Sequence, residues 1–484
     1  MSQDPFAVTR PLVVDLDGTL IPTDLLLESA SQFVLSHPLQ GFKPLLWALQ
    51  SRATLKAKLA ASTRIDVAAL PYNTEVLHWL RVQKQQGRSL VLATASHSVL
   101  AHQVAAHLQL FDEVLATQDQ VNLKAHAKAQ ALVARFGEDG FDYVGNDVAD
   151  FAVWQKAHTA HVVGASAHVL ARVRAMDKLG EVFDNNLPTP THSVFKALRV
   201  HQWMKNLLVF VPLFTAHLYG DAQRLVLAAL AFLAFSAMAS SVYLLNDLVD
   251  VQDDRHHVRK RTRPFASGAL SLLHGWLAWP VLLVASVSLS AAFLPLEFCA
   301  TLGIYCVLTL AYSFKLKQVA VLDVLTLAAL YTLRIMAGAV AVAVPLSFWL
   351  LLFSVFIFLS LALIKRFSEL KAARDAGQSG ALRGRGYAPE DLEMVSSLGG
   401  SAGFIAVLVL ALYIQDGQAP HLYGAPQLIW LACPALLFWI SRAWLIAHRG
   451  QMHDDPVVFA LKDKVSWGVV VFMASVLVLA RVWS

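Results

Sequence analysis

The feature that most constrains this chain of 484 residues is a series of long apolar runs behind residue 195. A helix needs ~20 apolar residues to cross the hydrocarbon core of a bilayer, and several of these runs reach that length. An ordinary soluble enzyme is therefore excluded, and we predict an all-α, polytopic membrane domain over residues 195–484. The nine predicted spans, of which the first is short, cover about residues 205–219, 225–246, 273–294, 297–313, 319–343, 346–364, 397–415, 426–447 and 466–482.

The front of the chain has a different composition, since residues 1–190 hold 34 of its 73 charged side chains. Short apolar runs alternate there with helical patterns such as AHAKAQALVARFG, which stops at Gly137. Strands separated by helices predict a parallel, Rossmann-like α/β sheet. The stretch at about 21–88 is too long for a loop and reads as an inserted helical cap. We place this domain at residues 1–180 and a polar linker at 181–194. The predicted strands lie in PLVVDLDGTL, GRSLVLATAS, FDEVLAT, FDYVGND and AHVVGA.

Charges between the predicted spans indicate an orientation. Lys and Arg are concentrated in every second loop, which predicts that those loops and the front domain face the cytoplasm. MSQDPFAVTR has no apolar signal core, which agrees with a cytoplasmic front domain and a multi-pass protein of the inner membrane. The same loops account for the net charge of +5, and no basic stripe with interleaved aromatics points to nucleic acid. Three cysteines without a CxxC pair predict neither disulfides nor zinc sites.

Two carboxylates lie two residues apart at the end of the first predicted strand. One of the two, Asp15 or Asp17, could attack phosphorus while the other handles the proton of the leaving group. Sites of open α/β sheets lie at the carboxyl ends of the strands, where Thr94 also ends a strand and could bind a phosphate oxygen. Lys124 or Lys128, at the start of a helical stretch, could neutralise the phosphoryl group, and the residues leave both open.

The sequence GNDVAD ends another predicted strand and offers Asn146, Asp147 and Asp150 as oxygen ligands for Mg²⁺. With DxDGT and the preceding elements in this order, residues 10–165 resemble the haloacid dehalogenase superfamily of phosphatases. The resemblance implies Asp15 as nucleophile, Asp17 as general acid and base, and Asp150 as metal ligand. The family usually has Gly-Asp where this chain has Gly145-Asn146, so a degenerate, regulatory domain is an alternative.

A second acidic motif stands at the end of the second predicted span, in LLNDLVDVQDDRHHVRKRTRPFASG. Asp247, Asp250 and Asp254 share one helical face at spacings of three and four residues, so they repel one another unless cations bridge them. Carboxylates at a membrane boundary are functional candidates, and oxygen ligands suit Mg²⁺. Lys260 and Arg263 follow and suit a diphosphate.

A later apolar helix contains Asp323 and Arg334, which predicts a polar cavity or a mutual pair. Together with NDxxDxxxD, which includes Asn246, this part of the chain resembles the UbiA superfamily of intramembrane prenyltransferases over residues 195–484. That resemblance implies nine transmembrane helices around a cavity that opens to the cytoplasm. The family's second motif usually contains DxxxD, but Leu327 stands in place of the second carboxylate here.

Three further segments look like the polyprenyl-phosphate phosphoribosyltransferase branch: LRVHQWMKNLLVFVPLF with Lys205, LIKRFSEL with Lys365 and Arg366, and DDPVVFALKDKVS. The resemblance implies Mg²⁺ as cofactor, phosphoribosyl diphosphate (PRPP) as donor and a polyprenyl phosphate lipid as acceptor. The residues expected to bind substrate are Lys205, Asn246, Lys260, Arg263, Asp323, Arg334, Lys365 and Arg366. The front domain would then remove the 5-phosphate of the product. The alternative is prenyl transfer from a prenyl diphosphate to an aromatic ring. The oligomeric state is not indicated.

Overall fold

The computed structural model describes residues 10–118, 123–378, 380, 385–415, 423–452 and 455–483. The chain forms two compact units. The first contains Met1–Leu198 together with Leu244–Ala278, and the second contains Arg199–Tyr243 together with Trp279–Ser484. Residues 244–278, which the sequence assigned to the membrane domain, thus pack with the α/β domain.

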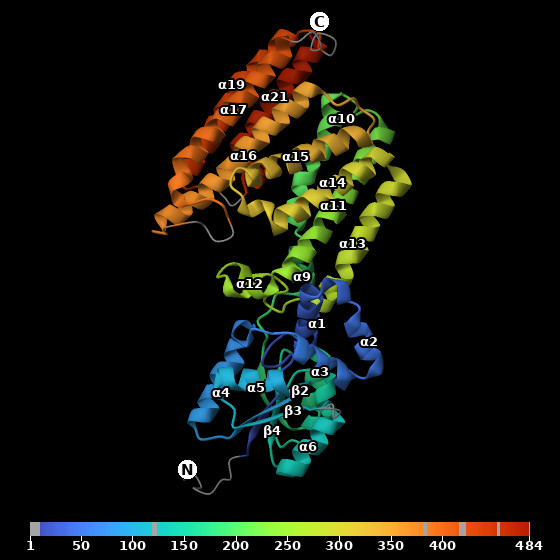
Figure 1. Cartoon of the computed structure of the whole chain (residues 1–484), viewed down its shortest axis with the longest axis vertical. Helices are drawn as coiled ribbons and strands as arrows, with labels where there is room; N and C mark the ends of the chain where they lie inside the picture. Colours follow the sequence, from blue (N-terminus) through green and yellow to red (C-terminus); the bar gives the residue numbers. More distant parts are fainter. Residues whose placement is uncertain are drawn as a thin grey trace. The chain divides into compact units, whose positions relative to one another are not determined.

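The first unit is built on a six-stranded parallel sheet with the order β3-β2-β1-β4-β5-β6 (Figure 1). The central strand β1 aligns Leu12 with Leu90 of β2 on one side and with Asp142 of β4 on the other. Its side chains are fully buried and alternate between two apolar clusters, one on each face of the sheet. The strands are Leu12–Val14 (β1), Leu90–His97 (β2), Glu113–Thr117 (β3), Asp142–Gly145 (β4), Ala160–Val163 (β5) and Leu179–Phe183 (β6).

The sheet confirms the α/β class, but β6 was not predicted as a strand. The strand was missed because Gly180 and Glu181 interrupt its apolar residues. Its last three residues lie in the polar linker expected at 181–194. Residues 179–183 pair with β5, and Phe183 joins the core. The sheet therefore extends three residues into the predicted linker. The last residues of that linker belong to a helix, α9 (Pro190–Ala197).

Four helices lie between β1 and β2, where the sequence predicted a helical insertion: α1 (Leu25–Ser36), α2 (Lys43–Gln50), α3 (Arg52–Ser62) and α4 (Thr74–Gln85). Asp24, Ser51 and Asn73 cap α1, α3 and α4 with side-chain hydrogen bonds, which satisfies backbone N–H groups at each start. The other helices that flank the sheet are α5 (Ser98–Leu108), α6 (His126–Phe136), α7 (Phe151–Trp154) and α8 (Ala167–Arg174). As predicted, α6 stops at Gly137, whose φ is 83°.

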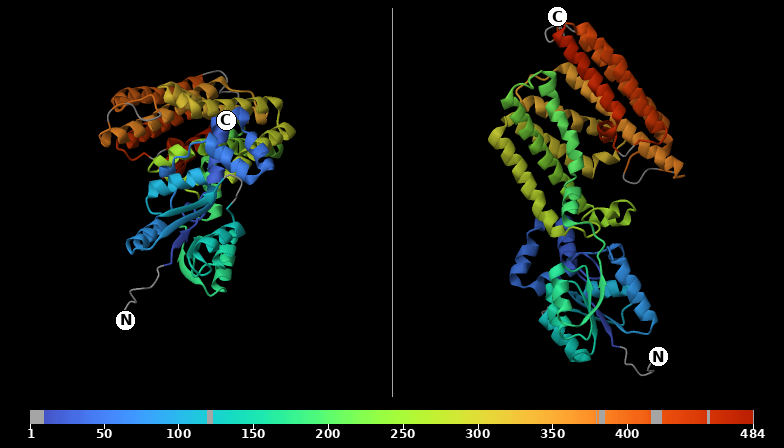
Figure 2. Two further views of the ribbon diagram at one scale, coloured as in Figure 1. Left: turned by 60° about the horizontal axis from the view of Figure 1, so that its bottom comes forward. Right: turned by 180° about the vertical axis from the view of Figure 1, so that it is seen from behind.

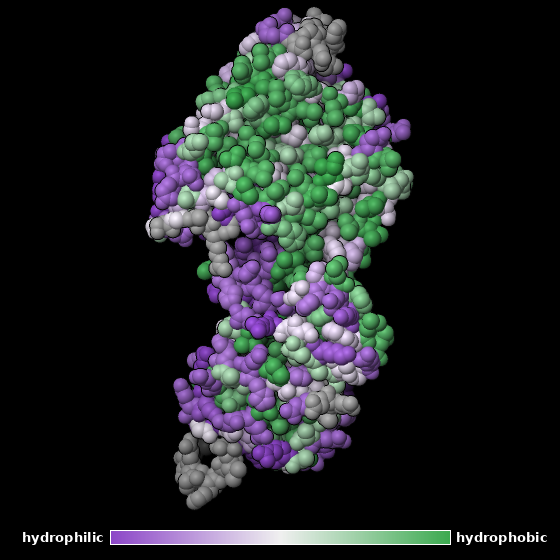
Figure 3. Space-filling view, in the orientation of Figure 1, coloured by the Kyte–Doolittle hydropathy of each residue, from purple (hydrophilic) through white to green (hydrophobic). Residues whose placement is uncertain are grey.

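In the described part of the chain, eight helices are long and apolar enough to cross a membrane (Figure 2). This confirms the multi-pass helical domain, with a number of spans close to the nine expected. Hydrophobic side chains cover much of the outer face of these helices in Figure 3, as a lipid-facing surface requires. They are α11 (Ala222–Val249), α13 (Leu272–Phe293), α14 (Leu296–Phe314), α15 (Leu322–Ala341), α16 (Phe348–Asp375), the span Pro389–Gln415 that includes α17 (Leu392–Gln415), the span Pro426–His448 that includes α19 (Ala432–His448), and α21 (Lys464–Val482).

The first predicted span, at 205–219, is not one long helix. A 3-10 helix, η4 (Val200–Phe210), is followed by the short helix α10 (Val211–Thr215). Pro212 lacks a backbone N–H, and Lys205 and Asn206 are buried polar residues on η4. The apolar composition predicted a membrane span here. Instead, the 3-10 helix η4 places two polar side chains in the interior of the unit.

Candidate active sites

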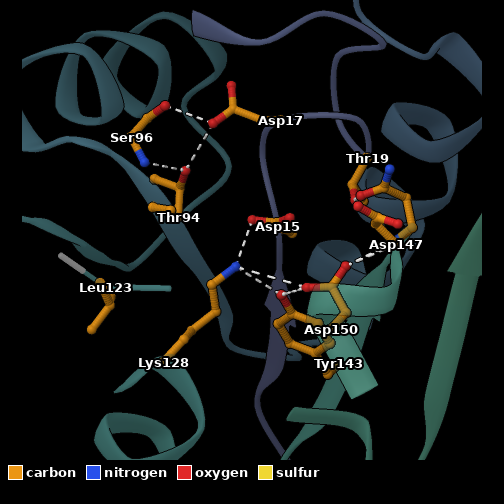
Figure 4. A network of polar contacts seen from close by, with 12 residues as sticks. Asp15, Asp17, Thr19, Thr94, Ser96, Leu123, Lys128, Tyr143, Asp147 and Asp150 are labelled. Atoms are coloured by element: carbon orange, nitrogen blue, oxygen red, sulfur yellow. Dashed lines mark hydrogen bonds and ion pairs between the residues drawn. The ribbon is translucent and has the colours of Figure 1, made fainter. Parts of the chain in front are cut away.

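The carboxyl ends of β1 and β4 bring one group of predicted residues together (Figure 4). The Lys128 ammonium donates to Asp15 Oδ1 at 2.8 Å and to the Tyr143 hydroxyl at 2.9 Å. Tyr143 in turn donates to Asp150 Oδ1 at 2.8 Å. Lys128 Nζ also lies 4.0 Å from Asp150 Oδ1, so two carboxylates from different strands flank one buried cation. Lys124 is exposed, so only Lys128 lies beside the predicted nucleophile.

Asp17 is held by a second group of contacts on the other side of the same strand end. Its Oδ1 accepts a hydrogen bond from the backbone N–H of Leu25 at the start of α1, at 2.9 Å. Its Oδ2 accepts from the hydroxyl of Ser96 at 2.6 Å and lies 3.5 Å from the hydroxyl of Thr94. The cap thus fixes the predicted general acid directly.

Burial dominates the electrostatics of both carboxylates. It raises the pKa of Asp15 to about 6, although Lys128 opposes the shift. Burial also raises the pKa of Asp17 to about 7, with Asp24 adding to the effect. Burial works against the charge of Lys128, but Asp15 and Asp150 outweigh it and raise its pKa. A carboxyl group whose pKa lies near neutrality can both give and take a proton, as a general acid and base must.

The GNDVAD segment places its three polar residues in different surroundings. Asp150 is buried, and its Oδ2 accepts hydrogen bonds from the backbone N–H groups of Asn146 and Asp147, at 2.9 and 3.1 Å. Asn146 accepts a hydrogen bond from the Thr19 hydroxyl at 3.2 Å, and its amide lies where a side chain on Gly18 would clash. Asp147 is exposed and accepts a hydrogen bond from the N–H of Val148.

The donor set of this strand-end site fits a Mg²⁺ ion. Asp15 and Asp150 offer hard carboxylate oxygens that already converge on one cation, the Lys128 ammonium. Within the residues that the structure describes, no group of three His, Cys, Asp or Glu side chains is arranged to hold a metal ion. Two carboxylates would therefore share an ion with backbone oxygens and water, as Mg²⁺ prefers.

The second acidic motif spans the end of α11 and the short helix α12 (Val251–His256). The two helices are separated at Asp250, but the ladder continues through it, since Asp254 N donates to Asp250 O at 2.7 Å. Asp247 and Asp254 are buried, and Arg263 NH1 pairs with both, at 3.2 and 2.7 Å.

A cation also fits this second motif. Asp254 Oδ1 is buried and accepts no hydrogen bond, and Lys260 Nζ lies 3.9 Å away from it. Burial raises the pKa of Asp254, which Arg263 opposes. A buried carboxylate oxygen without a donor gains most from a cation, because it has lost its water.

A buried ion pair fixes this motif to the α/β domain. Arg255 of α12 donates to both carboxylate oxygens of Glu28 on α1, at 3.1 and 2.6 Å. Both side chains are 2% exposed, and Arg255 Nε also bonds the carbonyl of Ala266. The cap helix that positions Asp17 therefore also holds the helix that carries Asp254, within one compact unit.

The second unit contains a separate group of buried polar residues. Arg334 donates from Nε to Asn206 Oδ1 at 2.9 Å and from NH2 to the Tyr305 hydroxyl at 3.0 Å. Lys205 forms a partly buried ion pair with Asp455, and its ammonium lies 5.7 Å from the ring centre of Tyr331. Lys205 and Arg334 thus face the interior of the helical unit from η4 and α15.

Asp323 does not pair with Arg334, which corrects one of the two expectations for that helix. Asp323 Oδ2 lies 2.7 Å from Arg366 NH2, and its Oδ1 accepts from the Tyr387 hydroxyl at 2.8 Å. Both charged side chains are 0% exposed. Two residues predicted to bind substrate are therefore partners of each other here. Arg366 stands on α16, one residue after the half-buried Lys365.

Sequence reasoning missed several residues of both sites. Ser96 and Tyr143 contact the predicted catalytic groups, but a serine and a strand tyrosine carry no chemical signal of their own. Ser96 could have been found from its spacing, two residues after Thr94. The pairing of Glu28 with Arg255, and of Asp455 in the DDPVVFALKDKVS segment with Lys205, could not be found, because the partners lie more than 220 residues apart in sequence.

The fold and sites define a membrane transferase class joined to a phosphatase-like domain, and comparison with known proteins agrees. A model of the UbiA prenyltransferase family matches residues 207–476, and a model of haloacid dehalogenase-like hydrolases matches residues 12–153. The chain belongs to the UbiA prenyltransferase family and carries an N-terminal haloacid dehalogenase-like domain.

Some relatives match nearly the whole chain, and others match a little more than half of it. The uncharacterised protein y4nM of Sinorhizobium fredii is 36% identical over 478 residues, which cover 99% of this chain and 92% of that protein. The nodulation protein NoeC of Azorhizobium caulinodans is 39% identical over 57% of this chain and 88% of its own length. The decaprenyl-phosphate phosphoribosyltransferase of Mycobacterium tuberculosis is 34% identical over 56% of this chain and 88% of its own length.

Proposed function

We propose that the chain is a bifunctional enzyme that makes a polyprenyl-phosphoryl ribose at the cytoplasmic face of the inner membrane. The helical domain transfers 5-phosphoribose from PRPP to a polyprenyl phosphate, and the front domain removes the 5-phosphate of the product. The observation that carries the proposal is the buried Asp15–Lys128–Asp150 group beside Asp17 in the same chain as the NDxxDxxxD motif.

The transfer half rests on the acidic motif and on the relatives named decaprenyl-phosphate phosphoribosyltransferase. An oxygen of the lipid phosphate attacks the anomeric carbon of PRPP, and the bond to the diphosphate breaks with its electron pair on the leaving group. Asp247, Asp250 and Asp254 would hold Mg²⁺, which neutralises a diphosphate when bound. Lys205, Lys260 and Arg263 supply positive charge for phosphate groups, and Asn246, Arg334 and Lys365 are further candidates for substrate contact.

The hydrolytic half rests on the strand-end site. A carboxylate oxygen of Asp15 attacks the phosphorus of the 5-phosphate and forms an aspartyl phosphate, while Asp17 protonates the departing ribose oxygen. Water then attacks the same phosphorus, and Asp17 takes its proton as inorganic phosphate leaves. Lys128 and Thr94 bind the oxygens of the phosphoryl group, and Asp15 and Asp150 would hold Mg²⁺, which offsets the charge of those oxygens when bound.

The test is incubation of detergent-purified protein with labelled PRPP, polyprenyl phosphate and Mg²⁺, followed by separation of the lipid products. Wild type should give a labelled lipid in which ribose, without its 5-phosphate, is joined to the polyprenyl chain through a phosphodiester. Asp15→Asn should accumulate the lipid that still carries the 5-phosphate, because the nucleophile is lost. Asp250→Asn should lower lipid labelling at least about 100-fold. Loss of a residue that only orients a metal ligand already costs about 10- to 100-fold, and loss of a ligand itself should cost more.

Each half can fail separately in this experiment. An unlabelled lipid fraction with wild type would contradict phosphoribosyl transfer, and a prenylated aromatic product formed from a prenyl diphosphate would replace it. Equal retention of the 5-phosphate by wild type and Asp15→Asn would contradict the hydrolytic half. The ion pair of Asp323 with Arg366 argues against the prenyl diphosphate donor, since the carboxylate of the usual second metal motif is neutralised by an arginine.

A further inference from the structure

An exposed apolar face lies on the cap, over the 3-10 helix η1 (Pro38–Gln40) and α2. Leu39 is 92% exposed, Leu45 71% and Leu49 83%, and Phe42 and Leu46 are more than half exposed. These positions follow the spacing of three and four residues that puts side chains on one side of a helix. Figure 3 shows hydrophobic side chains gathered over α2. We call these five residues the α2 face.

The α2 face is not the packing side of the helix. Trp47 points the other way, against Phe33 of α1 with 5.0 Å between the ring centres, and Lys58 of α3 lies 5.5 Å from the Trp47 ring. The helix is therefore already fixed to the cap through one side. A second, fully exposed apolar side is uncommon on soluble domains and marks a surface that meets a partner.

The stretch of sequence that contains the α2 face carries charge of one sign. Residues 29–65 contain no Asp or Glu, but they contain Lys43, Arg52, Lys56, Lys58 and Arg64. A helix with an apolar side and surrounding Lys and Arg matches the composition of helices that lie in the plane of an anionic bilayer surface. A protein partner of this patch would need an acidic rim, whereas phospholipid head groups supply negative charge everywhere.

Helix α1, which precedes the α2 face, contacts the start of the candidate membrane span α13. The Ser31 hydroxyl of α1 accepts a hydrogen bond from Trp276 Nε1 of α13 at 3.0 Å, and both residues belong to the first compact unit. Trp276 stands in the second turn of α13, beside the exposed Leu273 and Leu277. Tryptophan at the end of a span is typical of the membrane–water interface. The helix that precedes η1 and α2 is therefore attached at that level.

We propose that the α2 face inserts into the head-group region of the bilayer and docks the cap of the phosphatase-like domain on the membrane surface. Leu39, Phe42, Leu45, Leu46 and Leu49 enter the apolar layer, and Lys43, Arg52, Lys58 and Arg64 bind anionic head groups. Lys56 is not among these cations, since its ammonium donates to the carbonyl of Ala95. This docking is a property of the membrane-anchored chain and does not depend on which donor the helical domain uses.

The test uses the full chain in nanodiscs of phosphatidylcholine and anionic phosphatidylglycerol. Cys299, Cys306 and Cys433 are replaced by serine, and a fluorescent NBD label is attached at Leu45→Cys, at Leu49→Cys or at the control Ala134→Cys. Ala134 is exposed on α6, where Arg135, Glu138 and Gly137 surround it rather than an apolar face. Quenching by doxyl-labelled lipid is compared with quenching by iodide in the buffer.

At positions 45 and 49 we expect lipid quenching at least about twofold stronger than at 134, and iodide quenching weaker by a similar factor. Lipid quenching should fall when Arg52→Gln and Lys58→Gln are combined, because the attraction to anionic lipid decreases. Labels at 45 and 49 that iodide reaches as readily as the label at 134 would overturn the proposal. Protection from both quenchers would also overturn it, since a protein or second copy would then cover the face. The thermal midpoint of each labelled protein, equal to that of the unlabelled chain, shows that the cap is folded.

Discussion

The strand-end site of the first unit and the buried polar residues of the second were both predicted from sequence, but with different results. Asp15, Asp17, Thr94, Lys128 and Asp150 all converge, although they come from separate segments. Asp323, Arg334 and Arg366, by contrast, are divided among partners that the sequence did not indicate. Parallel strands end at one edge of a sheet, so chain order is enough to bring residues together there. Helices can rotate and cross in many ways, so a residue on one of them does not reveal its partner.

From this comparison we expect the Asp323–Arg366 pair to maintain the fold and Lys128 to act on the substrate. Arg366→Gln should lower the free energy of unfolding by about 3 to 5 kcal/mol, because it leaves Asp323 buried without its counterion. The double variant with Asp323→Asn should recover at least half of this loss. Denaturation in detergent measures both. The matched control is Arg374→Gln, whose pair with Glu393 is exposed and should cost less than about 1 kcal/mol.

A different outcome would move this pair into the binding machinery. If the double variant is as stable as wild type but its KM for the donor rises about tenfold or more, the pair opens to contact substrate, and the prediction from sequence is restored for Asp323 and Arg366. An unchanged KM with lower stability keeps the pair structural.

Within the strand-end site, the two lysines left open by the sequence can be separated. Lys128→Met should reduce phosphate release about 100- to 1,000-fold, the loss typical when one preorganised donor to a developing negative charge is removed. Lys124→Met should change it less than about threefold, because Lys124 is exposed. Hydrolysis of a soluble phosphate monoester with purified protein measures both. Equal losses in the two variants would show that residues 123–125 close over the site when substrate binds.

The smallest expected effect is on the free energy of unfolding, which the buried carboxyl group of Asp17 lowers. Asp17 has a pKa of about 7 in the folded protein against 3.8 for an ordinary Asp, so unfolding releases its proton between these values and stability falls as pH rises through them. Asp17→Asn removes this penalty. It should be more stable than wild type by about 1 to 2 kcal/mol at pH 8, a part of the ~4 kcal/mol that three pKa units represent, since the lost carboxylate also accepted two hydrogen bonds.

The measurement is the unfolding free energy at pH 5 and pH 8 in buffer with a chelator, so that no metal ion contributes. The difference between Asp17→Asn and wild type should shrink toward pH 5, where less of the penalty applies. A difference that is equal at both pH values would show that the gain comes from packing and not from the proton.

The sequence alone determined the class of each half of the protein. Apolar runs of about 20 residues permit little except membrane helices, and DxDGT followed by strand-end polar residues permits little except a phosphoryl-transfer site. It also located the acidic motif at 246–254, because the spacing that places carboxylates on one face of a helix is a local property. The helical cap and the stop of α6 at Gly137 were likewise readable from neighbouring residues.

The tertiary structure decided the pairings between distant residues. It set Glu28 against Arg255, gave Asp323 to Arg366, split the first predicted span into η4 and α10, and added β6 to the sheet from residues expected to be a linker. It also left the α2 face exposed, which no periodicity distinguishes from a core-facing side. Each of these outcomes depends on what packs against a segment, and a sequence pattern records only that a side is apolar or charged, not which partner it meets.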